Sequence, residues 1–78
     1  MDYLRHGLKE EPIEYHGYTI ELFTHEAPGG DWKGSYRIWR DGINLTGACL
    51  GNVFTSRGDA LVNASRLAKD QVDILAAK

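Results

Sequence analysis

The stretch YRIWRDGINLTG, residues 36–47, predicts two antiparallel strands joined by a tight turn. Asp41 and Gly42 at its centre are residue types that tolerate positive φ, as a type I′ hairpin turn requires. A two-residue turn also fixes which residues face each other across the hairpin. The predicted pairs are Arg40 with Ile43, Ile38 with Leu45, and Tyr36 with Gly47.

Side chains alternate between the two faces of a strand, so this register predicts which residues enter the core. The predicted core face holds Tyr36, Ile38, Leu45, Gly47 and Cys49. The predicted opposite face holds Ser35, Arg37, Trp39, Asn44, Thr46 and Ala48. Cys49 is the one cysteine of the chain, and in this apolar run we expect a buried thiol that packs as a small hydrophobe.

A further strand is predicted before the hairpin. The segment YTIELF, residues 18–23, alternates apolar and polar side chains with a period of two. Residues 15–18 upstream are compatible with two interpretations, a tight turn from a short extra strand at Ile13 or the irregular start of the same strand. Residues 24–31, with Pro28-Gly29-Gly30, predict a loop between the first and second strands.

The last part of the chain predicts one long helix. Ser56, with Asp59 three residues later, resembles a capping box in which Asp replaces the usual Glu. Apolar residues then recur at helical spacing and predict a buried stripe. The stripe contains Ala60, Leu61, Ala64, Leu67, Ala68, Val72 and Leu75.

These elements predict an α+β fold with a three-stranded antiparallel sheet (β-β-β-α) and one C-terminal helix packed on one face. Residues 13–78 form the predicted single domain, and residues 1–12 a flexible N-terminal tail. The N-terminal residues lack the apolar core of a signal peptide, and no run is long and apolar enough to span a membrane, so we expect a cytoplasmic protein.

A sheet with a helix on one face leaves its other face open, and we expect the binding residues there. The candidates are Phe23, Lys33, Arg37, Trp39, Asn44 and Thr46. Three interpretations of Trp39 remain: a cross-strand packing residue, part of a protein interface such as a homodimer contact, or a base-stacking residue in a nucleic-acid interface. The net charge of -2 gives no overall attraction to nucleic acid, so only a local basic patch could provide it.

The strand order and the segment Phe54-Thr55-Ser56-Arg57-Gly58-Asp59-Ala60 resemble the three-stranded DNA-binding domains of phage-type integrases and the AP2 family. The overall plan also resembles small bacterial proteins with three strands and a helix. The first resemblance implies DNA reading by the open sheet face; the second implies a fold and no activity. Glu21, expected on that face, departs from the DNA-binding pattern.

Residues with catalytic or metal-binding chemistry do not form a recognisable motif. His6, His16 and His25 are irregularly spaced, and Gly29-Gly30 lacks the lysine of a phosphate-binding loop. Glu10, Glu11 and Glu14 cluster in the predicted tail, whereas catalytic acids need fixed positions. We therefore expect no enzyme, no metal and no cofactor, but an interaction module that binds a protein partner or itself, with nucleic acid as the alternative.

Overall fold

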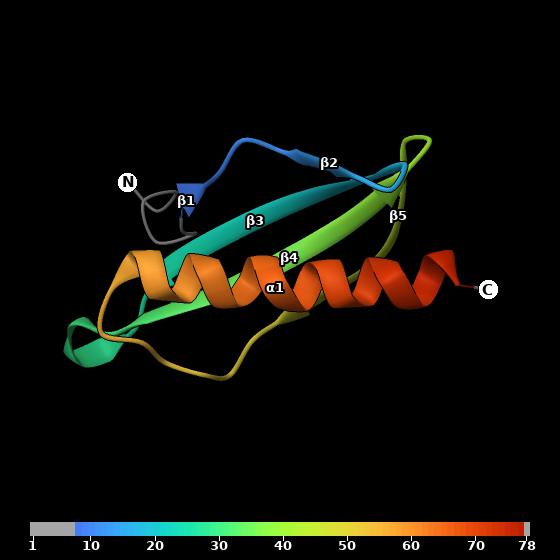
Figure 1. Cartoon of the computed structure of the whole chain (residues 1–78). Helices are drawn as coiled ribbons and strands as arrows, with labels where there is room; N and C mark the ends of the chain where they lie inside the picture. Colours follow the sequence, from blue (N-terminus) through green and yellow to red (C-terminus); the bar gives the residue numbers. More distant parts are fainter. Residues whose placement is uncertain (1–7, 78) are drawn as a thin grey trace.

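The computed structural model describes residues 8–77, which form an antiparallel sheet with one helix across one face (Figure 1). This arrangement confirms the predicted α+β class and the C-terminal helix. The elements are β1 (Leu8–Lys9), β2 (Ile13–Tyr15), β3 (Tyr18–Glu26), a 3₁₀ turn (Pro28–Gly30), β4 (Trp32–Arg40), β5 (Ile43–Cys49) and α1 (Arg57–Ala76).

The sheet has four strand positions, so the prediction of three was wrong. β3, β4 and β5 are neighbours in chain order, and the short β1 and β2 both pair antiparallel with the outer edge of β3. The two short strands form one interrupted strand, broken near Pro12, which has no N–H to donate. Residues 8 and 9 of the segment predicted as a tail thus belong to the sheet, and residues 1–7 lie outside the described residues.

Two tight turns set the hairpins. Asp41 and Gly42 have φ values of 52° and 78°, which confirms the predicted type I′ geometry. His16 and Gly17 have φ values of 51° and 82° and join β2 to β3 in the same way. The structure therefore selects the tight turn with an extra strand over the irregular strand start.

A β-bulge in β5 makes part of the predicted register wrong. Arg40 pairs with Ile43 as expected, but Ile38 pairs with Thr46 and leaves Leu45 as the extra residue. The side chain of Asn44 supports the bulge, since its Nδ2 donates to the carbonyl of Ile38 at 3.2 Å and to that of Thr46 at 3.3 Å. One inserted residue exchanges the two faces of everything that follows in the strand.

The exchange of faces corrects both predicted lists. Leu45 is 45% exposed, and Gly47 and Cys49 are exposed instead of buried. Ala48, predicted for the open face, packs against the core from the helix side. The expectation of a buried Cys49 thiol was therefore wrong.

The helix α1 begins where the sequence predicts. Ser56 is its N-cap, and the Ser56 Oγ accepts a hydrogen bond from the backbone N–H of Asp59 at 3.1 Å. The helix packs on β3 and β4 (Figure 1), and the core includes buried side chains from all three elements. These are Tyr18, Ile20, Leu22, Tyr36, Ile38, Ala60, Ala64, Ala68 and Val72. Within residues 8–77, no helix combines the length and apolar character needed to cross a membrane.

Close approach of the helix to β4 depends on Gly34. A Cβ atom at Gly34 would lie 2.8 Å from the Ala60 carbonyl oxygen and 2.9 Å from the Ala64 Cβ. Both distances are too short for real contacts, and the oxygen belongs to the backbone, so it cannot rotate away. Small residues on both sides of this contact therefore set the spacing between the two layers.

Candidate functional site

The open face is the face of the sheet that points away from α1. Along β3 and β4 the buried residues alternate with the residues of the open face. Four cross-strand pairs form its centre: Thr19 with Trp39, Glu21 with Arg37, Phe23 with Ser35, and His25 with Lys33. Strand pairing thus places Phe23, Lys33, Arg37 and Trp39 on one surface, as the sequence predicts.

Glu21 organises the middle of this surface. Its Oε2 lies 2.7 Å from the Lys9 Nζ, and its Oε1 accepts a hydrogen bond of 2.7 Å from the Trp39 indole N–H. The Lys9 ammonium is the main cause that lowers the pKa of Glu21 from its ordinary value of 4.5; the Trp39 hydrogen bond also lowers the pKa, whereas partial burial opposes both. The carboxylate therefore holds Lys9 of β1 and Trp39 of β4 on either side of β3.

The lowered pKa predicts acid sensitivity that depends on Glu21. Because the folded-state pKa lies below the unfolded one, ionised Glu21 stabilises the fold above pH 4.5, and this stabilisation is lost as the pH falls through the folded-state value. We expect Glu21→Gln to reduce the difference in urea midpoint between neutral and acidic buffer. Glu26→Gln, at an exposed position at the end of β3, serves as the control. An unchanged pH profile in Glu21→Gln would contradict the role assigned to this carboxylate.

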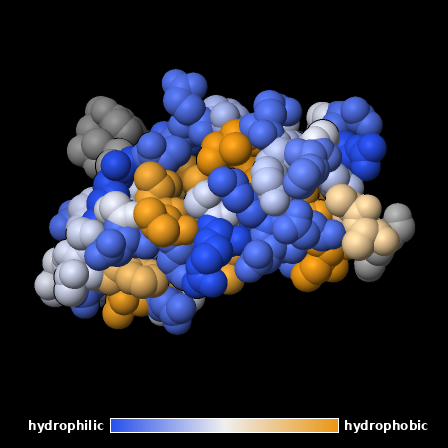
Figure 2. Space-filling view, in the orientation of Figure 1, coloured by the Kyte–Doolittle hydropathy of each residue, from blue (hydrophilic) through white to orange (hydrophobic). Residues whose placement is uncertain are grey.

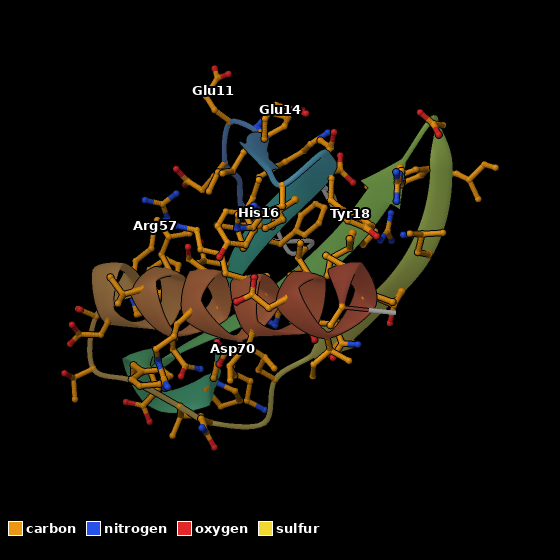
Figure 3. All side chains as sticks on the ribbon, turned by 45° about the vertical axis from the view of Figure 1, so that its right-hand side comes forward. Glu11, Glu14, His16, Tyr18, Arg57 and Asp70 are labelled. Carbon is orange, nitrogen blue, oxygen red and sulfur yellow. The ribbon has the colours of Figure 1, made fainter. Side chains whose placement is uncertain are left out.

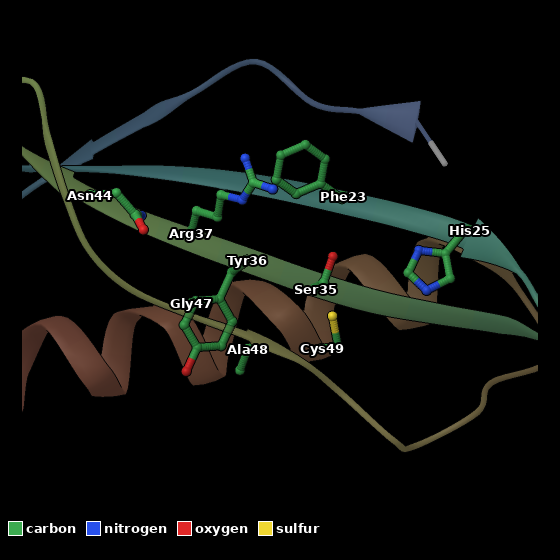
Figure 4. A pocket seen from close by; sticks show the side chains of 9 residues that line it. All are labelled: Phe23, His25, Ser35, Tyr36, Arg37, Asn44, Gly47, Ala48 and Cys49. Atoms are coloured by element: carbon green, nitrogen blue, oxygen red, sulfur yellow. The ribbon is translucent and has the colours of Figure 1, made fainter. Parts of the chain in front are cut away.

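Beside Glu21, Arg37 and Phe23 form the wall of a hollow in the open face. The hollow has a volume of about 540 Å³, and Figure 4 shows Arg37 extending over the face beside Phe23. The guanidinium carbon lies 5.6 Å from the centre of the Phe23 ring, within cation–π range. The hollow is lined by Phe23, His25, Ser35, Tyr36, Arg37, Asn44, Gly47, Ala48 and Cys49.

Gly47 leaves room in this hollow because it carries no side chain. A Cβ atom there would lie 2.8 Å from the Tyr36 carbonyl oxygen and 3.3 Å from the Arg37 Cγ. The glycine therefore allows the chain to pass close to β4 beside the Arg37 stem. The sequence contained a signal for this role, a glycine inside a strand, which often marks a bulge or a close backbone approach.

The structure divides the predicted site residues into three groups. Phe23, Lys33, Arg37 and Trp39 share the open face, with Arg37 exposed and Trp39 half-buried. Asn44 pairs with Trp39 and lines the hollow, but its amide is engaged in the bulge. Thr46 pairs with the buried Ile38, so it lies on the helix side and its predicted place on the open face was wrong.

Two further contributors were not among the predicted site residues. Lys9 lies in the segment expected to be a tail, and His25 in the segment expected to be a loop, but β1 and β3 extend into these segments. A prediction that extended β3 beyond Phe23 would have placed His25 on the open face by alternation. No sequence signal pairs Lys9 with Glu21.

A second hollow lies on the helix side, between α1 and β2. Its volume is about 490 Å³, and its lining is mostly apolar, from Ile13, Leu22, Leu61 and Val62, with Ser65, Arg66 and Lys69 completing it. Figure 2 shows apolar patches in this region within a largely hydrophilic surface. Its lining contains no aromatic side chain, whereas Phe23 lies beside Arg37 in the open face, which is therefore the stronger candidate.

No protein-family model, curated protein or solved structure matches this chain. The resemblances to DNA-binding domains and to small bacterial proteins remain predictions from the sequence.

Proposed function

We propose that this protein is a non-catalytic interaction module whose open face binds an acidic segment of another protein. The proposal rests on the exposure and the surroundings of the Arg37 side chain. It is exposed, it borders a hollow of about 540 Å³, and within residues 8–77 it forms no salt bridge. An arginine held over an aromatic ring offers a carboxylate two parallel hydrogen bonds and offers its neighbours an apolar surface.

The charge of the open face supports an acidic partner. The open face carries the cations Lys9, Lys33 and Arg37 and the carboxylates Glu14 and Glu21. Glu21 matches the charge of Lys9, whereas Glu14 accepts a hydrogen bond only from the neutral Thr19 hydroxyl, at 2.7 Å, and keeps its negative charge at the β2 edge of the face. Lys33 and Arg37 remain on the same face as Phe23, and within the described residues neither forms a salt bridge. Carboxylates of a partner would meet these cations, while an apolar side chain could enter the hollow beside the Phe23 ring.

Selection from a display library of short random peptides tests this proposal. We expect the selected peptides to be rich in Asp and Glu, and Arg37→Ala to weaken their binding about tenfold, the effect of losing a charged hydrogen bond. Arg66→Ala is the matched control, because Arg66 is exposed on α1, away from the open face. Selected peptides without acidic enrichment, or equal binding to Arg37→Ala, would contradict the proposal.

Nucleic acid is the second candidate for the same cations. Its support is the presence of Lys33 and Arg37 on one face. Against it, the Trp39 ring is half-buried and its N–H is bound to Glu21, so the ring is not free to stack on bases. Binding of short DNA or RNA that falls steeply with salt and is lost in Arg37→Ala would favour this candidate over the acidic peptide.

A further inference from the structure

The two edges of the sheet are protected very differently. The edge formed by β1 and β2 carries Lys9, Glu10, Glu11 and Glu14 and is interrupted at Pro12. Figure 3 shows Glu11 and Glu14 projecting outward at this edge, away from the helix. Charges and proline at an edge prevent another strand from pairing there. This edge is therefore closed to strand addition.

The opposite edge, formed by β5, has neither charges nor proline, and its one irregularity is the bulge at Leu45. Residues 42–56 contain neither a charged side chain nor a proline, and β5 lies inside this run. Ile43 is 63% exposed and Leu45 is 45% exposed. Among the described strands, β5 pairs only with β4. An exposed, neutral edge with apolar side chains is a ready template for another strand.

Backbone geometry identifies the groups that are free to pair. The Leu50 N–H donates to the Gly34 carbonyl at 3.1 Å, so at this position the chain faces β4. Ladder hydrogen bonds alternate along an antiparallel edge strand, so the N–H and C=O groups of Gly47 and Cys49 point away from β4. The bulge lies before this segment and leaves Thr46 to Cys49 in regular pairing with β4.

We propose that β5 pairs antiparallel with β5 of a second copy of this chain, so that one sheet continues through a two-fold axis. A neutral strand is its own complement, because no register within residues 42–56 places like charges opposite each other. A strand of an unrelated protein would be matched to β5 only through backbone hydrogen bonds. A second copy of this chain also brings a strand that is uncharged in the same way. The contact uses the backbone edge of β5, whose residues Gly47 and Cys49 also line the hollow, so the second copy would border the proposed peptide site without occupying it.

Sedimentation equilibrium in reducing buffer tests the dimer. We expect the mass of the wild type to rise with concentration from 8.7 kDa towards twice that value, since a contact of one strand is small and reversible. Leu45→Lys adds a charge to the exposed edge and should weaken association tenfold or more. Val62→Lys is the matched control, because Val62 is an aliphatic residue that is 68% exposed on α1. It should associate like the wild type.

Urea denaturation separates a direct contact from a general loss of stability. Leu45→Lys should lose the doubled mass while its urea midpoint stays close to that of Val62→Lys. A wild type that stays at 8.7 kDa at every concentration would overturn the proposal. So would Leu45→Lys that associates normally, or Val62→Lys that dissociates equally. Dissociation caused by Arg37→Ala would place the contact on the open face and also overturn the edge proposal.

Discussion

We expect Gly34→Val to unfold the domain at room temperature, and Gly34→Ala to lower the free energy of unfolding by about 3 kcal/mol. The first atom of any side chain at this position meets the Ala60 carbonyl oxygen at 2.8 Å. The helix must therefore move outward, and the packing of Ala60 and Ala64 against the sheet is lost with it. A domain of this size has only about 3–5 kcal/mol to lose.

Urea denaturation followed by tryptophan fluorescence measures this effect. Gly51→Ala is the matched control, because a Cβ atom at Gly51 meets nothing within 4 Å. Its urea midpoint should stay close to that of the wild type. A folded Gly34→Val with an unchanged midpoint would show that α1 does not approach β4 at this position.

The second large effect is expected from Ile38→Ala. Ile38 has no exposed surface and lies in β4 beneath the helix, within the core cluster. Removing its methyl and methylene groups leaves a cavity, and such substitutions lower the free energy of unfolding by about 2–5 kcal/mol. The variant should be largely unfolded or have a greatly reduced urea midpoint.

Ile43→Ala provides the comparison for the same chemical change at an exposed site. Ile43 is 63% exposed at the start of β5, so its truncation removes little buried surface. We expect a change of about 0.5 kcal/mol or less. Similar losses at both positions would contradict the burial of Ile38, and with it the assignment of the core face of β4.

Local signals in the sequence were sufficient for much of the fold. The Asp41-Gly42 turn needs only residues that adopt positive φ, and the helix needs only Ser56 as its cap and an apolar stripe. Each feature is decided within a few neighbouring residues. The helix also buries Asn63, which the apolar stripe does not include.

The bulge could not be predicted in this way. Alternation along residues 43–49 is equally compatible with two registers, and the choice depends on contacts between strands. The amide of Asn44 binds the Ile38 carbonyl, and Gly47 allows a close approach to Tyr36. The error in register then moved Thr46 into the predicted site.

The site was predicted in part for the same reason. Phe23, Arg37 and Trp39 follow from strand alternation, which the bulge leaves unchanged in β3 and β4. The link between Lys9 and Glu21 joins strands that are not consecutive in the chain, and nothing local encodes it. This link follows only from the pairing of β1 with β3.

The order of the strands has a consequence for the route by which the chain folds. The strands β2, β3 and β4 each pair with the next strand in the chain, so each pairing closes only a short loop and loses little entropy. Helix α1 follows β5 in the chain but packs on β3 and β4, so its contacts close longer loops. We therefore expect the consecutive hairpins to form before the helix docks on β3 and β4.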